Sequence, residues 1–207
     1  MRSRATTKAI SSRSKASNAL PESRKKNIAL TGFMAVGKSV VGRRLAQKLK
    51  WRFVDLDRAI EEAEGMKVHE IFERKGEAHF RRLEKQKLKQ VLRQGRQVIA
   101  AGGGAVVDKE NLRLLKEKSL LICLTAAPQT LLQRSGSGKG RPLLKGKDKR
   151  KRVEELLARR RERYAEAHVR IDTDSLSVDE VVDKIIKAIP ERTAPSPLPS
   201  PSGRGLS

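Results

Sequence analysis

The chain of 207 residues is poor in several kinds of residue, and each shortage excludes something. Aromatic residues make up only 3% of it, so aliphatic side chains must fill any core. The single cysteine, Cys123, rules out an intramolecular disulfide. Because Cys123 lies in the apolar run 120–124, we expect it to fill space in a buried strand. Cysteine usage of this kind is typical of a reduced, cytoplasmic protein.

Long apolar runs are also missing. No stretch approaches the roughly 20 apolar residues that a membrane-spanning helix requires, so we expect no membrane partner. The basic N-terminus lacks a following apolar segment, which argues against a secretory signal. A start rich in Arg and Ser and poor in acids is, however, also typical of organellar transit peptides. A plastid location therefore stays open as the alternative to the cytoplasm.

Acidic residues are scarce beside basic ones, at 24 against 47, and the net charge is +23. Residues 1–26 contribute +7 and residues 139–163 contribute +8. Such an excess favours non-specific binding to nucleic acid phosphates, so a basic nucleic-acid-associated protein is one alternative function. No recognised nucleic-acid-binding motif is present, and few aromatic side chains are available for base stacking. We expect no specific nucleic-acid partner.

Apolar periodicity alternates between strand and helix patterns from residue 27 to residue 189. It predicts strands at 27–31, 51–55, 97–101, 119–125 and 169–173. It predicts helices at 40–49, 57–64, 68–75, 77–92, 109–117, 128–134, 151–167 and 178–189, with Gly76 ending the third. This alternation indicates an α/β fold with a five-stranded parallel sheet and helices on both faces.

The same reading predicts the domain organisation. Residues 26–190 form one domain, and the tails 1–25 and 191–207 have the composition of disordered segments. Residues 135–149 are rich in Gly and Lys without periodicity, which predicts a long mobile loop. Arg141 lies in this loop, and a loop that carries arginine and lysine suits a lid that closes over phosphates. The alternative is an ordinary solvated basic loop.

Residues 32–39 read Gly-Phe-Met-Ala-Val-Gly-Lys-Ser and match the P-loop pattern G-x-x-x-x-G-K-S. A predicted strand precedes the match and a predicted helix follows it, which is the context that the pattern requires. Gly32 and Gly37 let the backbone turn so that its N–H groups point at an anion. Lys38 can reach the β- and γ-phosphates, and the Ser39 hydroxyl can bind Mg²⁺. The pattern predicts a nucleoside triphosphate site.

Two further groups of residues fall at predicted strand ends, where parallel α/β sheets bind ligands. Asp55 and Asp57 would project to the same side of an extended segment. One can then help to hold Mg²⁺ while the other accepts a proton from a substrate hydroxyl. Alternatively, Asp57 only caps the following helix. Gly102-Gly103-Gly104 allows the backbone to approach a ligand closely, unless it is an ordinary loop.

From Ile28 to about Ile189 the chain resembles shikimate kinase, a P-loop kinase of the nucleoside-monophosphate-kinase structural group. The resemblance is carried by the P-loop, Phe53-Val54-Asp55-Leu56-Asp57, Phe80-Arg81-Arg82-Leu83-Glu84, the triple glycine and Arg141-Pro142-Leu143-Leu144. It implies transfer of the γ-phosphoryl group of ATP to the 3-hydroxyl of shikimate, with Mg²⁺, in chorismate and aromatic amino-acid biosynthesis. A related small-molecule kinase, such as a gluconate kinase, is the alternative. We expect a monomer.

The resemblance also implies roles for individual residues. The ATP-binding residues are Gly32, Phe33, Met34, Ala35, Val36, Gly37, Lys38, Ser39, Val40, Arg134 and Arg141. The substrate-binding residues are Asp57, Arg81, Gly102, Gly103, Gly104 and Arg160. The catalytic residues are Lys38, Asp57 and Arg141, and the metal-binding residues are Ser39 and Asp55.

Some positions depart from the pattern of the family. Ala35 and Val36 stand where relatives often carry glycine or another small residue, and Val40 replaces a common threonine. Ala35 and Val36 occupy free positions of the P-loop pattern, so we expect their Cβ atoms to be tolerated. Arg160 is selected because it lies four residues before Tyr164, but it belongs to a run of three arginines, and a neighbour could take its place.

Overall fold

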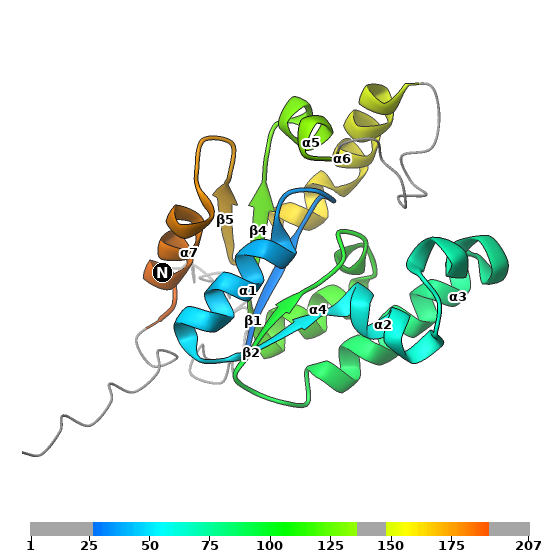
Figure 1. The fold of residues 1–207 in the computed structure, drawn as a ribbon, viewed down its shortest axis with the longest axis horizontal. Coiled ribbons are helices and arrows are strands. Elements are labelled where there is room, and N and C mark those ends of the chain that lie inside the picture. Colours follow the sequence, from blue (N-terminus) through cyan, green and yellow to red (C-terminus); the bar gives the residue numbers. More distant parts are fainter. Residues whose placement is uncertain (1–26, 136–147, 191–207) are drawn as a thin grey trace, which may run out of the picture.

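A computed structural model describes residues 27–135 and 148–190 (Figure 1). Both predicted tails and most of the predicted lid, including Arg141, lie outside the described residues. The strands form one sheet in the order β2-β3-β1-β4-β5, and every pairing is parallel. The predicted α/β fold with a five-stranded parallel sheet is therefore confirmed.

The elements alternate along the chain as predicted. The strands are β1 (Asn27–Gly32), β2 (Arg52–Asp55), β3 (Gln97–Ala100), β4 (Ser119–Thr125) and β5 (Val169–Asp172). The helices are α1 (Lys38–Leu49), α2 (Leu56–Glu64), α3 (Val68–Val91), α4 (Lys109–Lys118), α5 (Pro128–Ser135), α6 (Lys149–Ala165) and α7 (Val178–Lys187). A short 3₁₀ helix, η2 (Ala105–Val107), was not predicted. No described helix has the length and hydropathy to span a membrane.

One helix differs from the prediction. Residues 68–75 and 77–92 were expected to form two helices, whereas α3 runs through both with a kink at Gly76. The backbone of Gly76 has φ 81° and ψ 166°, which interrupts the helical path without a loop. Glycine adopts this left-handed φ without a steric penalty, so the predicted break is real but takes the form of a kink.

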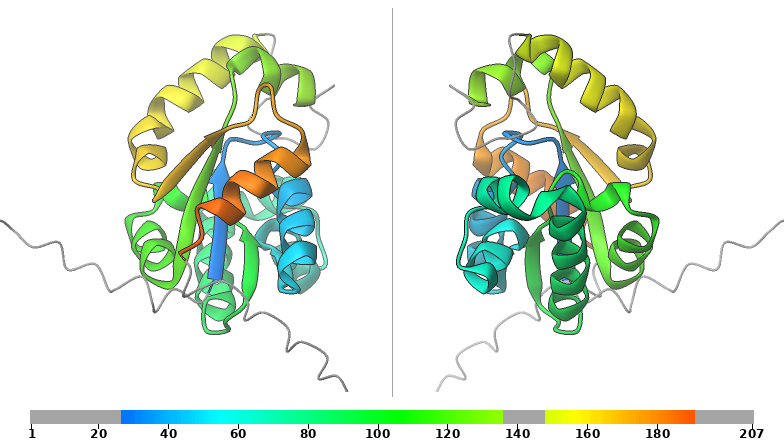
Figure 2. Two further views of the ribbon diagram at one scale, coloured as in Figure 1. Left: turned by 90° about the vertical axis from the view of Figure 1, so that its left-hand side faces the viewer. Right: turned by 90° about the vertical axis from the view of Figure 1, so that its right-hand side faces the viewer.

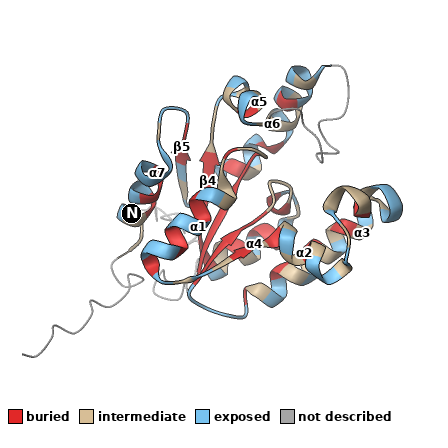
Figure 3. Ribbon diagram, in the orientation of Figure 1, coloured by how far each residue is buried: buried red, intermediate tan, exposed pale blue. Residues whose placement is uncertain are grey.

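Helices cover both faces of the sheet, as expected for parallel strands buried on two sides (Figure 2). On one face, α1, α5 and α7 pack over a core that includes Leu30, Leu45, Ile122 and Val182. On the other face, α2, α3 and α4 pack over a second core that includes Ile99, Leu121 and Leu88. Figure 3 shows the buried residues concentrated in the sheet and on the helix surfaces that face it.

Cys123 lies in the second core and is fully buried. Burial raises the pKa of its thiol to about 11, so the thiol stays protonated at neutral pH. The expected space-filling role of Cys123 is confirmed.

The strand order brings three loops together. β1 lies between β3 and β4, and β2 lies beyond β3, so the segments after β1, β2 and β3 leave the same edge of the sheet. The backbone N–H of Ala101 extends this pairing by donating to the carbonyl of Leu30 over 2.9 Å. In Figure 1, α5 and α6 lie above this edge and the α2–α3 pair projects to its side. The edge is thereby enclosed on two sides.

Truncation of a buried side chain on β4 tests the packing of the first core. Ile122 is fully buried on β4, so Ile122→Ala should lower the free energy of unfolding by about 2–5 kcal/mol. Val107→Ala is the control, because Val107 is 47% exposed and should cost less than about 0.5 kcal/mol. Urea denaturation measures both, and equal losses would contradict the assignment of Ile122 to the core.

Candidate active site

The P-loop turns through several left-handed residues. Gly32 and Gly37 have φ values of 133° and 101°, and a Cβ atom on Gly32 would collide with the carbonyl oxygen of Leu124. Ala35 also has a positive φ of 64°, which costs a non-glycine residue about 1–2 kcal/mol. Val36 is buried in the first core. The Cβ atom of Val36 is thus accommodated by packing, whereas the Cβ atom of Ala35 is accommodated at a cost in backbone energy.

Lys38 begins α1 directly after the loop, so its backbone lies at the N-terminal, electropositive end of the helix. Its Nζ donates to the carbonyl oxygens of Gly32 and Phe33, each over 3.0 Å. The ammonium group is therefore already inside the curve of the loop, where phosphate oxygens would lie. Val40, one position after Ser39, is 55% exposed and offers no polar group.

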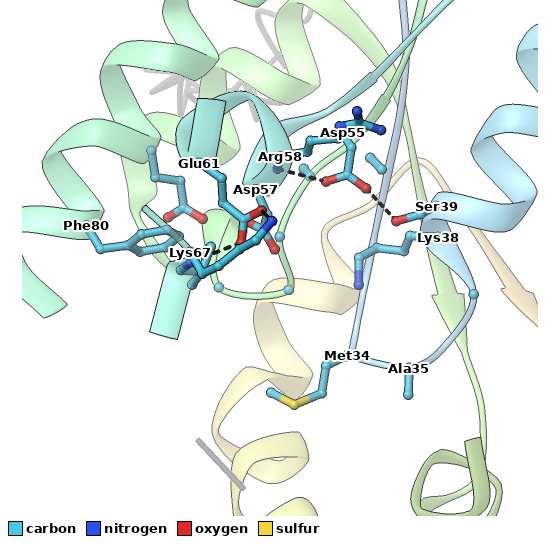
Figure 4. A pocket seen from close by; sticks show the side chains of 18 of the residues that line it. Met34, Ala35, Lys38, Ser39, Asp55, Asp57, Arg58, Glu61, Lys67 and Phe80 are labelled. Atoms are coloured by element: carbon cyan, nitrogen blue, oxygen red, sulfur yellow. Dashed lines mark hydrogen bonds and ion pairs between the residues drawn. The ribbon is translucent and has the colours of Figure 1, made fainter. Parts of the chain in front are cut away.

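Ser39 and Asp55 form a hydrogen-bonded pair beside the loop. The hydroxyl of Ser39 donates to Oδ2 of Asp55 over 2.6 Å (Figure 4). Oδ1 of Asp55 accepts from the backbone N–H of Arg58 and caps α2. Hydroxyl and carboxylate oxygens suit Mg²⁺, but the described part of the chain contains no cluster of three or more His, Cys, Asp or Glu that could hold a metal. Phosphates and water would have to complete the coordination.

Asp57 does not lie where the extended-strand argument put it. It belongs to the first turn of α2, and Asp55 rather than Asp57 caps that helix. Both parts of that expectation were wrong, because the helix begins one residue earlier than predicted. The two acids nevertheless line the same cavity, since the helix start turns Asp57 back toward Lys38 (Figure 4).

A buried acid that the sequence reasoning missed lies next to Asp57. Glu84 is 1% exposed, and its Oε2 accepts from Nη1 of Arg81 over 2.8 Å. Its Oε1 has no hydrogen-bond partner among the described residues. A Cβ atom on Gly102 would lie 3.1 Å from this oxygen and 3.1 Å from Oδ1 of Asp57, so the glycine separates the two carboxyls. The spacing of Phe80, Glu84 and Leu88 on one helical face was the signal that could have revealed it.

Burial raises the pKa of both carboxyls. For Asp57 burial is the largest cause, and the ammonium of Lys38 opposes it. For Glu84 burial again dominates, and the guanidinium of Arg81 opposes it. The negative charge of Asp55 adds to the upward shift of the Asp57 pKa, because like charges disfavour a second ionisation.

Arg81 lies against the triple glycine. It forms ion pairs with Glu77 over 3.0 Å and with Glu84 over 2.8 Å, and it lies 5.3 Å from the centre of the Phe80 ring. A Cβ atom on Gly104 would come within 2.6 Å of both terminal nitrogens of Arg81. The missing side chain at Gly104 therefore makes room for the guanidinium, which argues against the ordinary-loop interpretation of the glycines.

Arg160 enters the same region from α6. It is the buried member of the three consecutive arginines, at 7% exposure, whereas Arg159 and Arg161 are exposed. None of the ion pairs found among residues 27–135 and 148–190 includes Arg160. The sequence analysis selected Arg160 because it lies four residues before Tyr164, and this is the arginine of the three that lines the cavity.

One cavity of about 860 Å³ connects these groups. Its lining includes the predicted site residues Met34, Ala35, Gly37, Lys38, Ser39, Val40, Asp55, Asp57, Arg81, Gly102, Gly103, Gly104, Arg134 and Arg160. Arg134 is held by Thr173, whose hydroxyl and carbonyl oxygens accept its N–H groups over 2.9 and 2.8 Å. Three predicted residues of the loop, Gly32, Phe33 and Val36, are buried and do not line the cavity. The arrangement sets phosphate-binding groups beside paired carboxyls and arginines.

The raised pKa of Asp57 predicts a measurable effect on stability. A neutral Asp57 carboxyl contributes stability fully at pH values below its ordinary pKa of 3.8, and that contribution is lost as the pH rises through the folded-state pKa. Asp57→Asn keeps the shape and removes the ionisation. The variant should therefore be more stable than the wild type near pH 7, and the difference in the free energy of unfolding should shrink toward about pH 4.

Urea denaturation of the ligand-free protein at several pH values measures this difference. Because both proteins share every other titrating group, subtraction isolates Asp57. A variant that is less stable near pH 7, or a difference that grows in acid, would contradict the assignment.

The comparisons with known proteins agree on one family. Residues 34–190 match the family model described as shikimate kinase. The chain is 43% identical over 162 residues to shikimate kinase of Thermodesulfovibrio yellowstonii, covering 78% of this chain and 94% of that protein. It is 44% identical over 160 residues to shikimate kinase of Geobacter metallireducens, covering 77% of this chain and 89% of the relative.

Solved structures extend the agreement to the fold. The structure of shikimate kinase from Acinetobacter baumannii in complex with shikimate superposes with a TM-score of 0.77 and 34% identity. That match covers 82% of this chain and 97% of the solved chain. The crystal structure of shikimate kinase from Aquifex aeolicus gives a TM-score of 0.70 at 34% identity, over 78% of this chain and 95% of the other. The chain belongs to the shikimate kinase family.

Proposed function

We propose that this chain transfers the γ-phosphoryl group of ATP to the 3-hydroxyl of shikimate, and that the cavity residues divide this work between two ends. The observation that carries the proposal is the continuity of the cavity. It joins Lys38 and Ser39 to Asp57, and Asp57 to Arg81 and Arg160. A phosphate donor and a small hydroxylated carboxylate can therefore be bound side by side, which is the main requirement of in-line phosphoryl transfer.

The nucleotide end consists of the loop from Gly32 to Val40. Its backbone N–H groups and the start of α1 hold the phosphates, and Lys38 neutralises their charge. Mg²⁺, when bound beside Ser39 and Asp55, neutralises further charge on the phosphates. Arg134 lies at the same end, held by Thr173, and is assigned to the adenine side. Arg141, which lies outside the described residues, is assigned to a lid that brings a further cation to the phosphates.

The acceptor end consists of two arginines and three glycines. Arg81 and Arg160 can bind a carboxylate in a forked geometry that lysine cannot reproduce. The charge of Arg81 is already balanced by ion pairs with Glu77 and Glu84, whereas Arg160 forms no ion pair among the described residues and only opposes the upward shift of the Glu84 pKa through its charge. A buried charge without a partner is costly, and a ligand carboxylate would supply the partner. Gly102, Gly103 and Gly104 allow shikimate to lie against the backbone.

Asp57 lies between the two ends and is assigned the role of proton acceptor. A base is most effective when its pKa is close to the working pH, and burial moves the pKa of Asp57 in that direction. Its carboxylate can also accept hydrogen bonds from neighbouring shikimate hydroxyls. Family membership argues against the gluconate kinase alternative. The monomeric state and the cytoplasmic location stay predictions.

Removal of the P-loop lysine tests the nucleotide end. Lys38→Ala should lower kcat for shikimate-dependent ADP formation by at least about 10³-fold, because charge neutralisation of the transferred group is lost. The midpoint of thermal unfolding should change little, since Lys38 is only partly buried. A coupled assay with shikimate and, in parallel, gluconate as acceptors measures the activity. Turnover with gluconate alone would overturn the proposal.

Removal of Arg160, the arginine without an ion pair among the described residues, tests the acceptor end. Arg160→Ala should raise the KM for shikimate by about 10- to 100-fold, the effect of losing a charge-assisted hydrogen bond, and leave the KM for ATP nearly unchanged. Arg159→Ala is the matched control, because Arg159 is the exposed neighbour on the same helix. An equal effect of the two substitutions would show that general positive charge, rather than Arg160, attracts the acceptor.

A further inference from the structure

The two arginines of the acceptor end are held in different ways. Arg81 is oriented by carboxylates, with Glu84 at 2.8 Å and Glu77 at 3.0 Å. Arg160 is more deeply buried but belongs to no ion pair of the described residues. A long, flexible side chain without a charged partner must be oriented by something else, because ordering it costs conformational entropy.

Two neutral aromatic side chains, Phe33 and Tyr164, lie next to Arg160. The Cζ atom of Arg160 lies 5.8 Å from the centre of the Phe33 ring, within the range of a cation–π interaction. Phe33 comes from the P-loop and is 2% exposed, so this contact is screened from water. Tyr164, one helical turn after Arg160, is 6% exposed, and its hydroxyl donates to the carbonyl oxygen of Gly103 over 3.0 Å.

Gly103 lies at the point where these groups meet. A Cβ atom at this position would lie 2.5 Å from the carbonyl oxygen of Gly32, 3.1 Å from the hydroxyl of Tyr164 and 3.4 Å from Nη1 of Arg160. The P-loop, the triple glycine and α6 therefore meet at one glycine. Burial raises the pKa of Tyr164 to about 12 against the opposing effect of the Arg160 guanidinium, so the phenol stays a hydrogen-bond donor at neutral pH.

We propose that Phe33 and Tyr164 are positioning residues for the acceptor: the Phe33 ring holds the guanidinium of Arg160, and the Tyr164 hydroxyl holds the Gly103 peptide beside it. Both partners are neutral. A carboxylate in their place would orient Arg160 equally well, but it would also cancel the charge that the shikimate carboxylate requires. A ring face and a hydroxyl orient the cation and leave its charge available.

The inference rests on the proposed function, because it assumes that Arg160 binds the carboxylate of the acceptor. It adds a role for Phe33 that nucleotide binding does not require. The side chain of Phe33 is buried, and its backbone carbonyl accepts a hydrogen bond from Lys38. Substitution of a P-loop side chain should thus affect the acceptor rather than the nucleotide.

Two conservative substitutions test the inference. Phe33→Leu keeps an apolar side chain and removes the ring face, and Tyr164→Phe removes only the hydroxyl. Each should raise the KM for shikimate by about 3- to 10-fold, and by more than it raises the KM for ATP. Calorimetric titration with shikimate alone should show the same loss of affinity. Phe53→Leu is the matched control, because it removes the contact of Phe53 with Arg43, 5.5 Å away, outside the acceptor site.

A double-substitution cycle separates positioning from general damage. In an Arg160→Ala background, Phe33→Leu should have no further effect on the KM for shikimate, because its action passes through Arg160. An undiminished effect in that background, or an equal rise in the KM for ATP, would overturn the inference. If Arg160→Ala itself leaves the KM for shikimate unchanged, the carboxylate clamp of the proposed function fails. If Arg160→Ala weakens shikimate but the two aromatic substitutions do not, only the positioning role fails.

Discussion

The pairing of β1 with β3 and β4 is the constraint on which the rest of the structure depends. Its parallel register places the end of β1, and with it the P-loop, directly beside the glycines that follow β3. The hydrogen bond from Ala101 to Leu30 continues this pairing to the point where both chains leave the sheet. A shift of one residue would invert the side-chain faces and remove Gly103 from its contact with Gly32.

Electrostatics inside the cavity follows from burial. The carboxyls of Asp57 and Glu84 are separated by Gly102, and both are disfavoured in their charged form. Arg81 balances Glu84, so the remaining positive charge of the acceptor end resides on Arg160. The same burial that costs stability in the free protein strengthens the attraction for an anionic ligand. Stability and ligand binding are therefore in competition at this site.

The fold could be predicted in large part from the sequence. The strand and helix patterns were strong because β1, β3 and β4 are buried on both faces and each helix is buried on one, and the observed ends differ from the predicted ends by at most two residues. The predictions that differed from the structure concerned single residues at the ends or breaks of helices. Whether Asp57 caps α2 depends on where the helix begins, and periodicity leaves a helix start uncertain by a residue or two. Gly76 was recognised as a break, but its kinked form depends on the packing of α3.

The sequence by itself determined the phosphate-binding chemistry, because the P-loop residues are contiguous and their spacing sets the backbone turn. It also determined which residues were candidates for the acceptor, through a resemblance spread over the chain. Only the tertiary structure decided how they cooperate. It showed that Arg160 rather than Arg159 or Arg161 faces the cavity, that Glu84 is buried beside Asp57, and that Phe33 and Tyr164 surround Arg160. These contacts join residues up to 127 positions apart (33 and 160), and burial at such a distance is decided by packing rather than by local sequence.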